Sequence, residues 1–290
     1  MHVELTEEQE MIRAMAREFA DKEVRPIAAE IDRDARFPRE TVRRMGALGL
    51  LGMTIPPAYG GSGADAVSYV VAMEEIAKAC ASHSAIMSVN NSLYCESVYK
   101  YGTEEQRQRL LVPFVTGEKI GCFALTEPQA GSDATNQATL AVRDGDHYVV
   151  NGRKVFVTSG RESSAALVFC QTDREKGHRG ISALIIEKGT PGFLVPTVEE
   201  KLGLRASDTA EFVFEDCRVP VANRLGDEGL GFKIAMSSLD SGRIGIAAQA
   251  VGIAQAAMEE AVGYAKQRKQ FGKKISEFQD RKSTRLNSSH

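Results

Sequence analysis

The chain has 290 residues, of which 43% are apolar and 26% charged, a composition typical of an ordinary globular protein. Its 36 basic and 39 acidic residues give a net charge of −3, which disfavours a nucleic-acid binder that relies on overall positive charge. No apolar run reaches the roughly 18 residues of a membrane-spanning helix, and we expect no signal peptide. The five scattered cysteines favour free thiols in a reducing compartment, so a cytoplasmic location is expected.

The first region, residues 1–118, is predicted to be an α-helical domain. Thr6-x-x-Gln9 has the pattern of a capping box, and apolar residues recur at the helical period from Ile12 to Phe19. Pro38 can open a second helix, because its fixed φ suits a first turn. Further helices are expected over about residues 66–80, 84–100 and 103–116.

The second region, residues 119–228, changes to the period of β-structure. Runs of β-branched and aromatic residues predict short strands at residues 120–125, 147–150, 155–158, 165–170, 181–186 and 211–219. Asp144-Gly145 and Asn151-Gly152 are dipeptides typical of hairpin turns. Many short strands at this spacing predict an antiparallel β-sandwich or barrel domain.

The third region, residues 229–280, is again helical and is crowded with small residues. A glycine inside a helix costs roughly 1 kcal/mol relative to alanine, so Gly242, Gly245 and Gly252 imply close packing against another helix. We expect an incomplete C-terminal helical bundle, in which further helices cover the small-residue face around Gly245, Ala248 and Gly252.

Residues 281–290 differ from the helical pattern before them. Leu286 is the one apolar residue among these ten, which is too few for a packed face, and no cap or glycine stop separates them from the helix. We expect a non-native tail; the alternative is an ordinary disordered terminus.

Common nucleotide, nucleophile and metal motifs are poorly matched. Residues 60–63 lack the spacing and the preceding strand of a dinucleotide fingerprint, and residues 226–231 indicate a turn and a helix start. No phosphate-loop or nucleophile-elbow pattern occurs. Cys80 and His83 lie close in sequence, but two ligands do not make a metal site, so none is expected.

The densest chemistry lies in residues 124–133, Ala-Leu-Thr-Glu-Pro-Gln-Ala-Gly-Ser-Asp, which follow an expected strand. Pro128 fixes the backbone and Gly131 permits close approach. The loop can therefore offer N–H and hydroxyl groups to a planar or phosphorylated ligand. A plain connection between strands is the alternative.

This loop resembles the first signature of the acyl-CoA dehydrogenase family. Residues 154–160 resemble the family's strand that closes over a flavin, and Arg268-x-x-Phe271-Gly272 resembles part of its third region. Residues 239–247, Leu-Asp-Ser-Gly-Arg-Ile-Gly-Ile-Ala, look most like the short-chain, butyryl-CoA branch. The likeness covers the chain up to Gln279 and implies a helical domain, a middle β-domain and a C-terminal helical bundle.

The resemblance also implies FAD, held between the β-domain and the last domain. By this likeness the flavin contacts are Phe123, Ala124, Leu125, Thr126, Ser132, Phe156, Val157 and Thr158, with Arg268 and Gln279 reaching the cofactor of a neighbouring subunit. The implied acyl-CoA contacts are Ser132, Asp240, Ser241, Gly242 and Arg243. Electron-transfer flavoprotein as electron acceptor and a homotetramer are further implications.

The implied reaction is the α,β-dehydrogenation of a short-chain acyl-CoA to a trans-2-enoyl-CoA. A carboxylate removes the α-proton of a polarised thioester, and the flavin accepts hydride from the β-carbon. The family's general base is a Glu that lies beyond Gln279, so no catalytic residue is assigned and this chain alone is expected to be inactive. Phe156 stands where the family usually has Trp, which removes an indole N–H.

Two other function classes stay open. A flavin oxidase, hydroxylase or nitroalkane oxidase of the same fold is disfavoured by the short-chain signature. A non-catalytic fragment that binds FAD or acyl-CoA is the other alternative.

Overall fold

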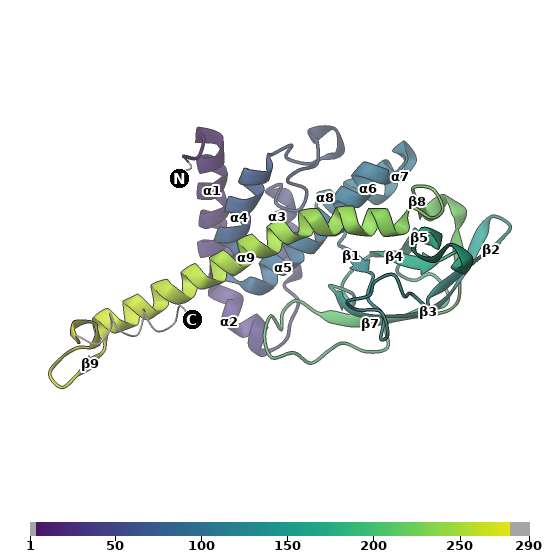
Figure 1. The fold of residues 1–290 in the computed structure, drawn as a ribbon. Helices are drawn as coiled ribbons and strands as arrows, with labels where there is room; N and C mark the ends of the chain where they lie inside the picture. The colour runs from purple at the N-terminus through teal and green to yellow at the C-terminus, as the bar shows by residue number, and fades with distance from the viewer. Residues whose placement is uncertain (1–3, 279–290) are drawn as a thin grey trace.

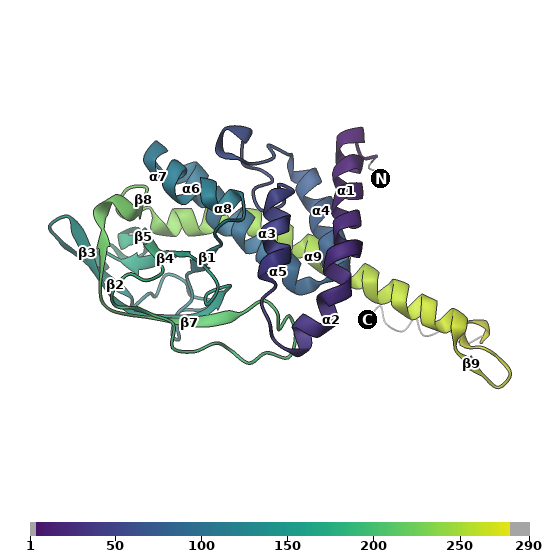
Figure 2. The same cartoon turned by 180° about the vertical axis from the view of Figure 1, so that it is seen from behind.

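The computed structural model describes residues 4–278, so Gln279 and residues 281–290 lie outside the described residues. A helical part and a β-sheet lie side by side, and the long helix α9 (Gly231–Gln267) runs along both (Figure 1). The reverse view shows the last turns of α9 extending beyond the rest of the molecule (Figure 2). The predicted fold class is confirmed. Among the described residues, no helix combines the length and apolar character needed to cross a membrane.

The N-terminal part consists of helices that follow closely on one another. They are α1 (Glu7–Phe19), α2 (Arg25–Arg33), α3 (Arg39–Ala47), α4 (Ala66–Ala79), α5 (Ala81–Ser88), α6 (Glu96–Tyr101), α7 (Glu104–Leu110) and α8 (Val112–Val115). Thr6 accepts a hydrogen bond from the Gln9 amide while the Gln9 side chain accepts from the Thr6 amide, so the predicted capping box is present. The α-helix expected over residues 84–100 is instead interrupted by a π-helical segment, η3 (Val89–Cys95). Such π-turns often occur at functional sites.

One buried histidine in these helices makes stability depend on pH. The His83 ring is fully buried on α5, where its Nε2 lies 2.7 Å from the Thr41 hydroxyl, and burial lowers its pKa to about 4. On acidification, His83 is therefore protonated near pH 6.5 in the unfolded chain but only near pH 4 in the folded chain. The contribution of the neutral His83 ring to the free energy of unfolding is therefore fully present above pH 6.5. It is lost progressively as the pH falls from 6.5 toward 4.

We expect His83 to remove about 2 kcal/mol from the free energy of unfolding by pH 5. Urea unfolding of the parent and of His83→Gln at pH 7.5 and pH 5 measures this, because Gln can keep a hydrogen bond to Thr41 without titrating. If the two proteins lose the same stability on acidification, His83 is not the source.

The sheet contains every predicted strand, together with short strands that the pattern missed. The strands are β1 (Gly121–Ala124), β2 (Leu140–Asp144), β3 (His147–Thr158), β4 (Ala165–Gln171), β5 (Ile181–Glu187), β6 (Phe193–Leu194), β7 (Thr209–Pro220) and β8 (Arg224–Leu225). Their order is β6-β7-β3-β2-β4-β5-β8, with β1 paired to β4. Pairing is mostly antiparallel, but β1 and β2 each run parallel to β4.

Of the two predicted hairpin turns, one is confirmed and one is wrong. Asp144 pairs with His147 across a turn in which Gly145 has a φ of +62°. Asn151-Gly152 lies instead inside the continuous strand β3, at a register shift against β7. Gly152 has a φ of +150°, and a Cβ there would lie 2.6 Å from the Thr139 Cα. The glycine thus serves a β-bulge and a close strand approach.

The small residues of α9 face the N-terminal helices, so the prediction that further helices cover them is wrong. A Cβ at Gly242 would lie 2.9 Å from Leu93 of η3, and one at Gly252 would lie 2.5 Å from the Glu74 carbonyl oxygen of α4. Ala248 is buried in the same seam. Helices approach this closely only where side chains are small, and α4 already occupies that face. The opposite face exposes large apolar side chains: Ile246, Val251, Ile253, Met258 and Tyr264.

Candidate active site

A cavity of about 170 Å³ forms where η3, β1, β3 and α9 meet. It is lined by Val89, Leu93, Phe123, Leu125, Thr126, Val155, Phe156, Thr158 and Leu239. Five of these, Phe123, Leu125, Thr126, Phe156 and Thr158, are residues for which flavin contact is predicted. Segments about 30 residues apart in the β-domain thus converge on one cavity, which α9 and η3 close from the helical side.

Phe156 takes an unusual backbone conformation at this cavity. Its φ is +57°, and the register of β3 against β7 shifts between Lys154 and Val157. A positive φ is strained for a bulky residue, and such strain clusters at functional sites. The bulge leaves 65% of Phe156 exposed while Val157 is buried. An aromatic face is therefore presented to the cavity instead of being packed in the sheet.

The loop that follows β1 is held firmly against this bulged strand. The Val155 amide donates to the Thr126 carbonyl oxygen at 2.9 Å, and the next residues close a tight turn through reciprocal backbone hydrogen bonds between Glu127 and Ala130. Below the turn, the Lys154 Nζ lies 2.7 Å from the Glu127 Oε1, and both side chains are buried. Burial raises the pKa of Glu127, but the Lys154 ammonium and the hydrogen bonds from Thr139 and Ala138 together outweigh it and hold that pKa below its ordinary value.

The chemistry of the cavity fits the flavin ring of FAD. A planar aromatic ring system requires apolar and aromatic surfaces on its faces, and polar donors at its heteroatoms. The exposed ring of Phe156 and the side chain of Leu239 supply the apolar surfaces. The hydroxyl-bearing residues Thr126 and Thr158 lie on the same wall. These residues therefore suit the ring portion of the cofactor.

Other predicted flavin residues are placed differently. Ala124 and Val157 are buried in the core of the β-domain and do not line the cavity, since adjacent residues of a strand point to opposite faces. Ser132 is exposed in a bend near the end of the loop, and Arg268 is exposed at the C-terminal end of α9. Gln279 lies outside the described residues.

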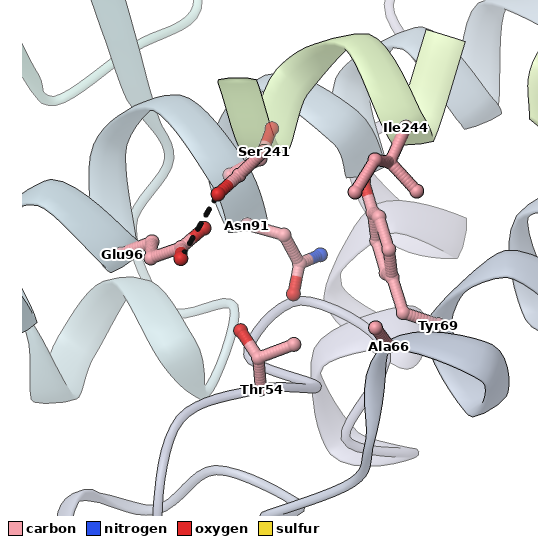
Figure 3. A pocket seen from close by; sticks show the side chains of 8 residues that line it. Thr54, Ala66, Tyr69, Asn91, Glu96, Ser241 and Ile244 are labelled. Atoms are coloured by element: carbon pink, nitrogen blue, oxygen red, sulfur yellow. Dashed lines mark hydrogen bonds between the residues drawn. The ribbon is translucent and has the colours of Figure 1, made fainter. Parts of the chain in front are cut away.

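The predicted substrate residues of α9 point in two directions. Asp240 and Arg243 are exposed and form an ion pair of 2.6 Å one turn apart. Ser241 instead lines a second cavity of about 100 Å³ and donates to the Glu96 Oε1 at 3.1 Å (Figure 3). Gly242 is buried against Leu93. Successive helical residues are about 100° apart, so the four cannot share one face.

Sequence reasoning missed the helical side of the cavity. Val89 and Leu93 project from the π-helical turn, and the neighbouring Asn90 accepts from the Gly121 amide at 3.0 Å, which fixes the start of β1. Asn90 is fully buried and also donates to the carbonyl oxygens of Leu51 and Phe114. The only sequence signal for this role was a pair of asparagines inside an apolar helical pattern.

The arrangement agrees with comparison to known protein families. Models of the acyl-CoA dehydrogenase N-terminal, middle and C-terminal domains match residues 6–118, 122–217 and 229–286. The chain belongs to the acyl-CoA dehydrogenase family. It is 54% identical over 279 residues to the short-chain specific acyl-CoA dehydrogenase of Clostridium acetobutylicum, covering 96% of this chain and 74% of that relative.

Solved structures agree with this family membership. Butyryl-CoA dehydrogenase from Megasphaera elsdenii superposes with a TM-score of 0.94 at 44% identity, over 99% of this chain and 76% of that one. A chain in the structure described as the electron transferring flavoprotein of Acidaminococcus fermentans gives 0.96 at 48% identity, over 99% and 76%. Acyl-CoA dehydrogenases are oxidoreductases that use FAD, and one similar structure is described in complex with FADH2. FAD is the cofactor of this acyl-CoA dehydrogenase.

Proposed function

We propose that this acyl-CoA dehydrogenase oxidises short-chain acyl-CoA thioesters to trans-2-enoyl-CoA. The observation that carries the proposal is the cavity in which Phe156, Thr126 and Thr158 of the β-domain face Leu93 of η3 and Leu239 of α9. FAD supplies the hydride acceptor when it is bound. Phe156 presents a stacking face, and the hydroxyls of Thr126 and Thr158 donate to the ring. Donors placed before the reaction stabilise charge that develops during it.

The helical side of the cavity is apolar, as an acyl chain beside the flavin ring requires. Val89, Leu93 and Leu239 supply these apolar side chains. The short length of the acyl chain is supported by the 54% identity to a short-chain specific relative. The resemblance assigns Asp240, Ser241, Gly242, Arg243 and Ser132 to the CoA portion of the substrate. Of these, the exposed residues Asp240, Arg243 and Ser132 are proposed as CoA contacts, because Gly242 is buried against Leu93 and Ser241 is hydrogen-bonded to Glu96.

Acyl-chain preference tests the proposal without requiring turnover. Butyryl-CoA, isovaleryl-CoA and octanoyl-CoA are titrated into the FAD-loaded chain while changes in the flavin absorption bands are followed. We expect the lowest dissociation constant for butyryl-CoA. Tighter binding of octanoyl-CoA or isovaleryl-CoA contradicts the short-chain assignment, and the absence of any flavin band contradicts the FAD site.

Arg243 provides a residue-level test of the CoA contacts. Its guanidinium is largely exposed on α9 beside Asp240, where it can reach a phosphate or stack on an adenine. Loss of one charge-assisted hydrogen bond costs about 1.5–3 kcal/mol, so Arg243→Ala should weaken butyryl-CoA binding by about tenfold or more. The matched control is Arg13→Ala, which breaks a similar ion pair with Glu10 on α1. Equal affinities for the two variants refute the role.

The remaining parts of the proposal concern organisation and partners. The proposed domains are residues 1–118, 119–228 and 229–280, followed by a non-native tail at 281–290. The match to the C-terminal family model ends at residue 286, within this proposed tail. The exposed apolar face of α9 supports assembly into a homotetramer. Electron-transfer flavoprotein is proposed as the acceptor, supported by the likeness to a chain in a structure described by that name. Five buried free cysteines support a reducing, cytoplasmic location.

A further inference from the structure

A buried ion pair lies directly behind the wall of the cavity. The side chains of Lys154 and Glu127 are 0% and 1% exposed, and their charged atoms are 2.7 Å apart. Lys154 belongs to β3 and lies two residues before the strained Phe156. Glu127 follows Thr126 in the loop after β1. The pair therefore joins the two segments that carry the proposed flavin contacts.

Both charges are fully surrounded by hydrogen-bond partners. The Lys154 Nζ also donates to the Leu125 carbonyl oxygen and to the Gln137 Oε1, each at 3.1 Å. The Glu127 carboxylate accepts from the Ala138 amide at 2.7 Å and the Gln129 side chain at 2.6 Å. The pair thus fastens the loop, β3 and the segment before β2 to one another, and no charge is left uncompensated.

This network determines where cavity atoms lie. Leu125, whose carbonyl oxygen accepts from Lys154, is itself a lining residue. Thr126 lies between the two residues that the ammonium holds, and its own carbonyl oxygen accepts from Val155. A loop released from Lys154 could slide along β3 and carry the Thr126 hydroxyl away from Phe156.

A buried ion pair is weak evidence for stability, because apolar residues of similar volume often stabilise a fold as well or better. Positioning is the function that such a replacement cannot supply. We infer that Lys154 and Glu127 are positioning residues, which hold Thr126 against the bulge of β3 so that the flavin-facing wall keeps one arrangement. That the ligand is a flavin rests on the proposed function, whereas the geometry of the wall does not.

The test replaces the pair with apolar residues of similar size, Glu127→Leu/Lys154→Met. The control is Arg17→Met/Glu75→Leu, which removes a 2.7 Å ion pair between α1 and α4, remote from the β-domain. For each protein we measure thermal unfolding, hydrogen exchange of the Val155 amide, and the affinity and absorption spectrum of bound FAD. A second variant, Glu127→Gln/Lys154→Gln, keeps a hydrogen bond without the charges.

We expect the apolar double variant to stay folded, to exchange the Val155 amide at least tenfold faster and to bind FAD at least tenfold more weakly with a shifted flavin spectrum. The amide double variant should recover part of the lost Val155 amide protection and part of the lost FAD affinity. The Arg17→Met/Glu75→Leu control should match the parent in both measurements. Unchanged Val155 exchange in a folded variant overturns the inference. Failure of both variants to fold also overturns it, since the pair is then a requirement of folding. A parent chain that binds no FAD refutes the proposed function, while Val155 exchange still decides this inference.

Discussion

Butyryl-CoA added anaerobically to the FAD-loaded 290-residue chain is expected to bleach its flavin about 10²-fold to 10⁴-fold more slowly than it bleaches the flavin of the Clostridium acetobutylicum relative. A positioned general base contributes about 10²–10⁴-fold to such a reaction. Within residues 4–278, no carboxylate lines the cavity that holds Phe156 and Thr158. Glu127 is buried against Lys154, and Glu96 lines the other cavity, paired to Lys100.

The relative serves as the positive control, and stopped-flow absorbance in the flavin bands is the measurement. Bleaching at a comparable rate would show that a carboxylate of this chain acts as the base. Glu96→Gln is then the first variant to examine, because Glu96 accepts a hydrogen bond from Ser241 of α9. A rate unchanged in that variant removes Glu96 from consideration.

Gly252→Ala is expected to lower the free energy of unfolding by about 3 kcal/mol, the upper part of the range for overpacking. The added Cβ would lie 2.5 Å from the Glu74 carbonyl oxygen and 2.7 Å from the Ala77 Cβ, and backbone atoms cannot move aside cheaply. Gly263→Ala is a matched control on the same helix, since nothing lies within 4 Å of its Cβ position. The control should stabilise the chain by about 0.5–1 kcal/mol through helix propensity.

Urea unfolding midpoints of the two variants and the parent measure these effects. Their opposite signs report whether α9 packs on α4 through its small residues. Equal stabilisation by both substitutions would mean that nothing packs against the face around Gly252, and would contradict the packing of α9 on α4.

The elements with a strong local signal could be predicted from the sequence. The capping box at Thr6 and the strands of the β-domain are determined mainly by residues adjacent in sequence, and the structure confirms both predictions. Asn151-Gly152 shows the limit of local reasoning. The same dipeptide suits a hairpin turn or a bulge, and only the nearby Thr139 backbone decides for the bulge.

The β-domain wall of the cavity was predictable through the resemblance to the acyl-CoA dehydrogenase family. Its residues lie in two short signatures, whereas the opposite wall depends on packing. Leu93 reaches the cavity because η3 is π-helical and Gly242 leaves room for it beside α9. The orientation of Ser241 toward Glu96 is likewise set by how α9 docks. The periodicity of the sequence does not predict these tertiary contacts.

A crystal structure of this chain grown with FAD would locate the flavin ring directly. We expect the flavin ring in the cavity between Phe156 and Leu239, with the hydroxyls of Thr126 and Thr158 about 3 Å from ring heteroatoms. A ring bound elsewhere, such as beside Ser241 and Glu96, with Phe156 free of contact, would contradict this placement.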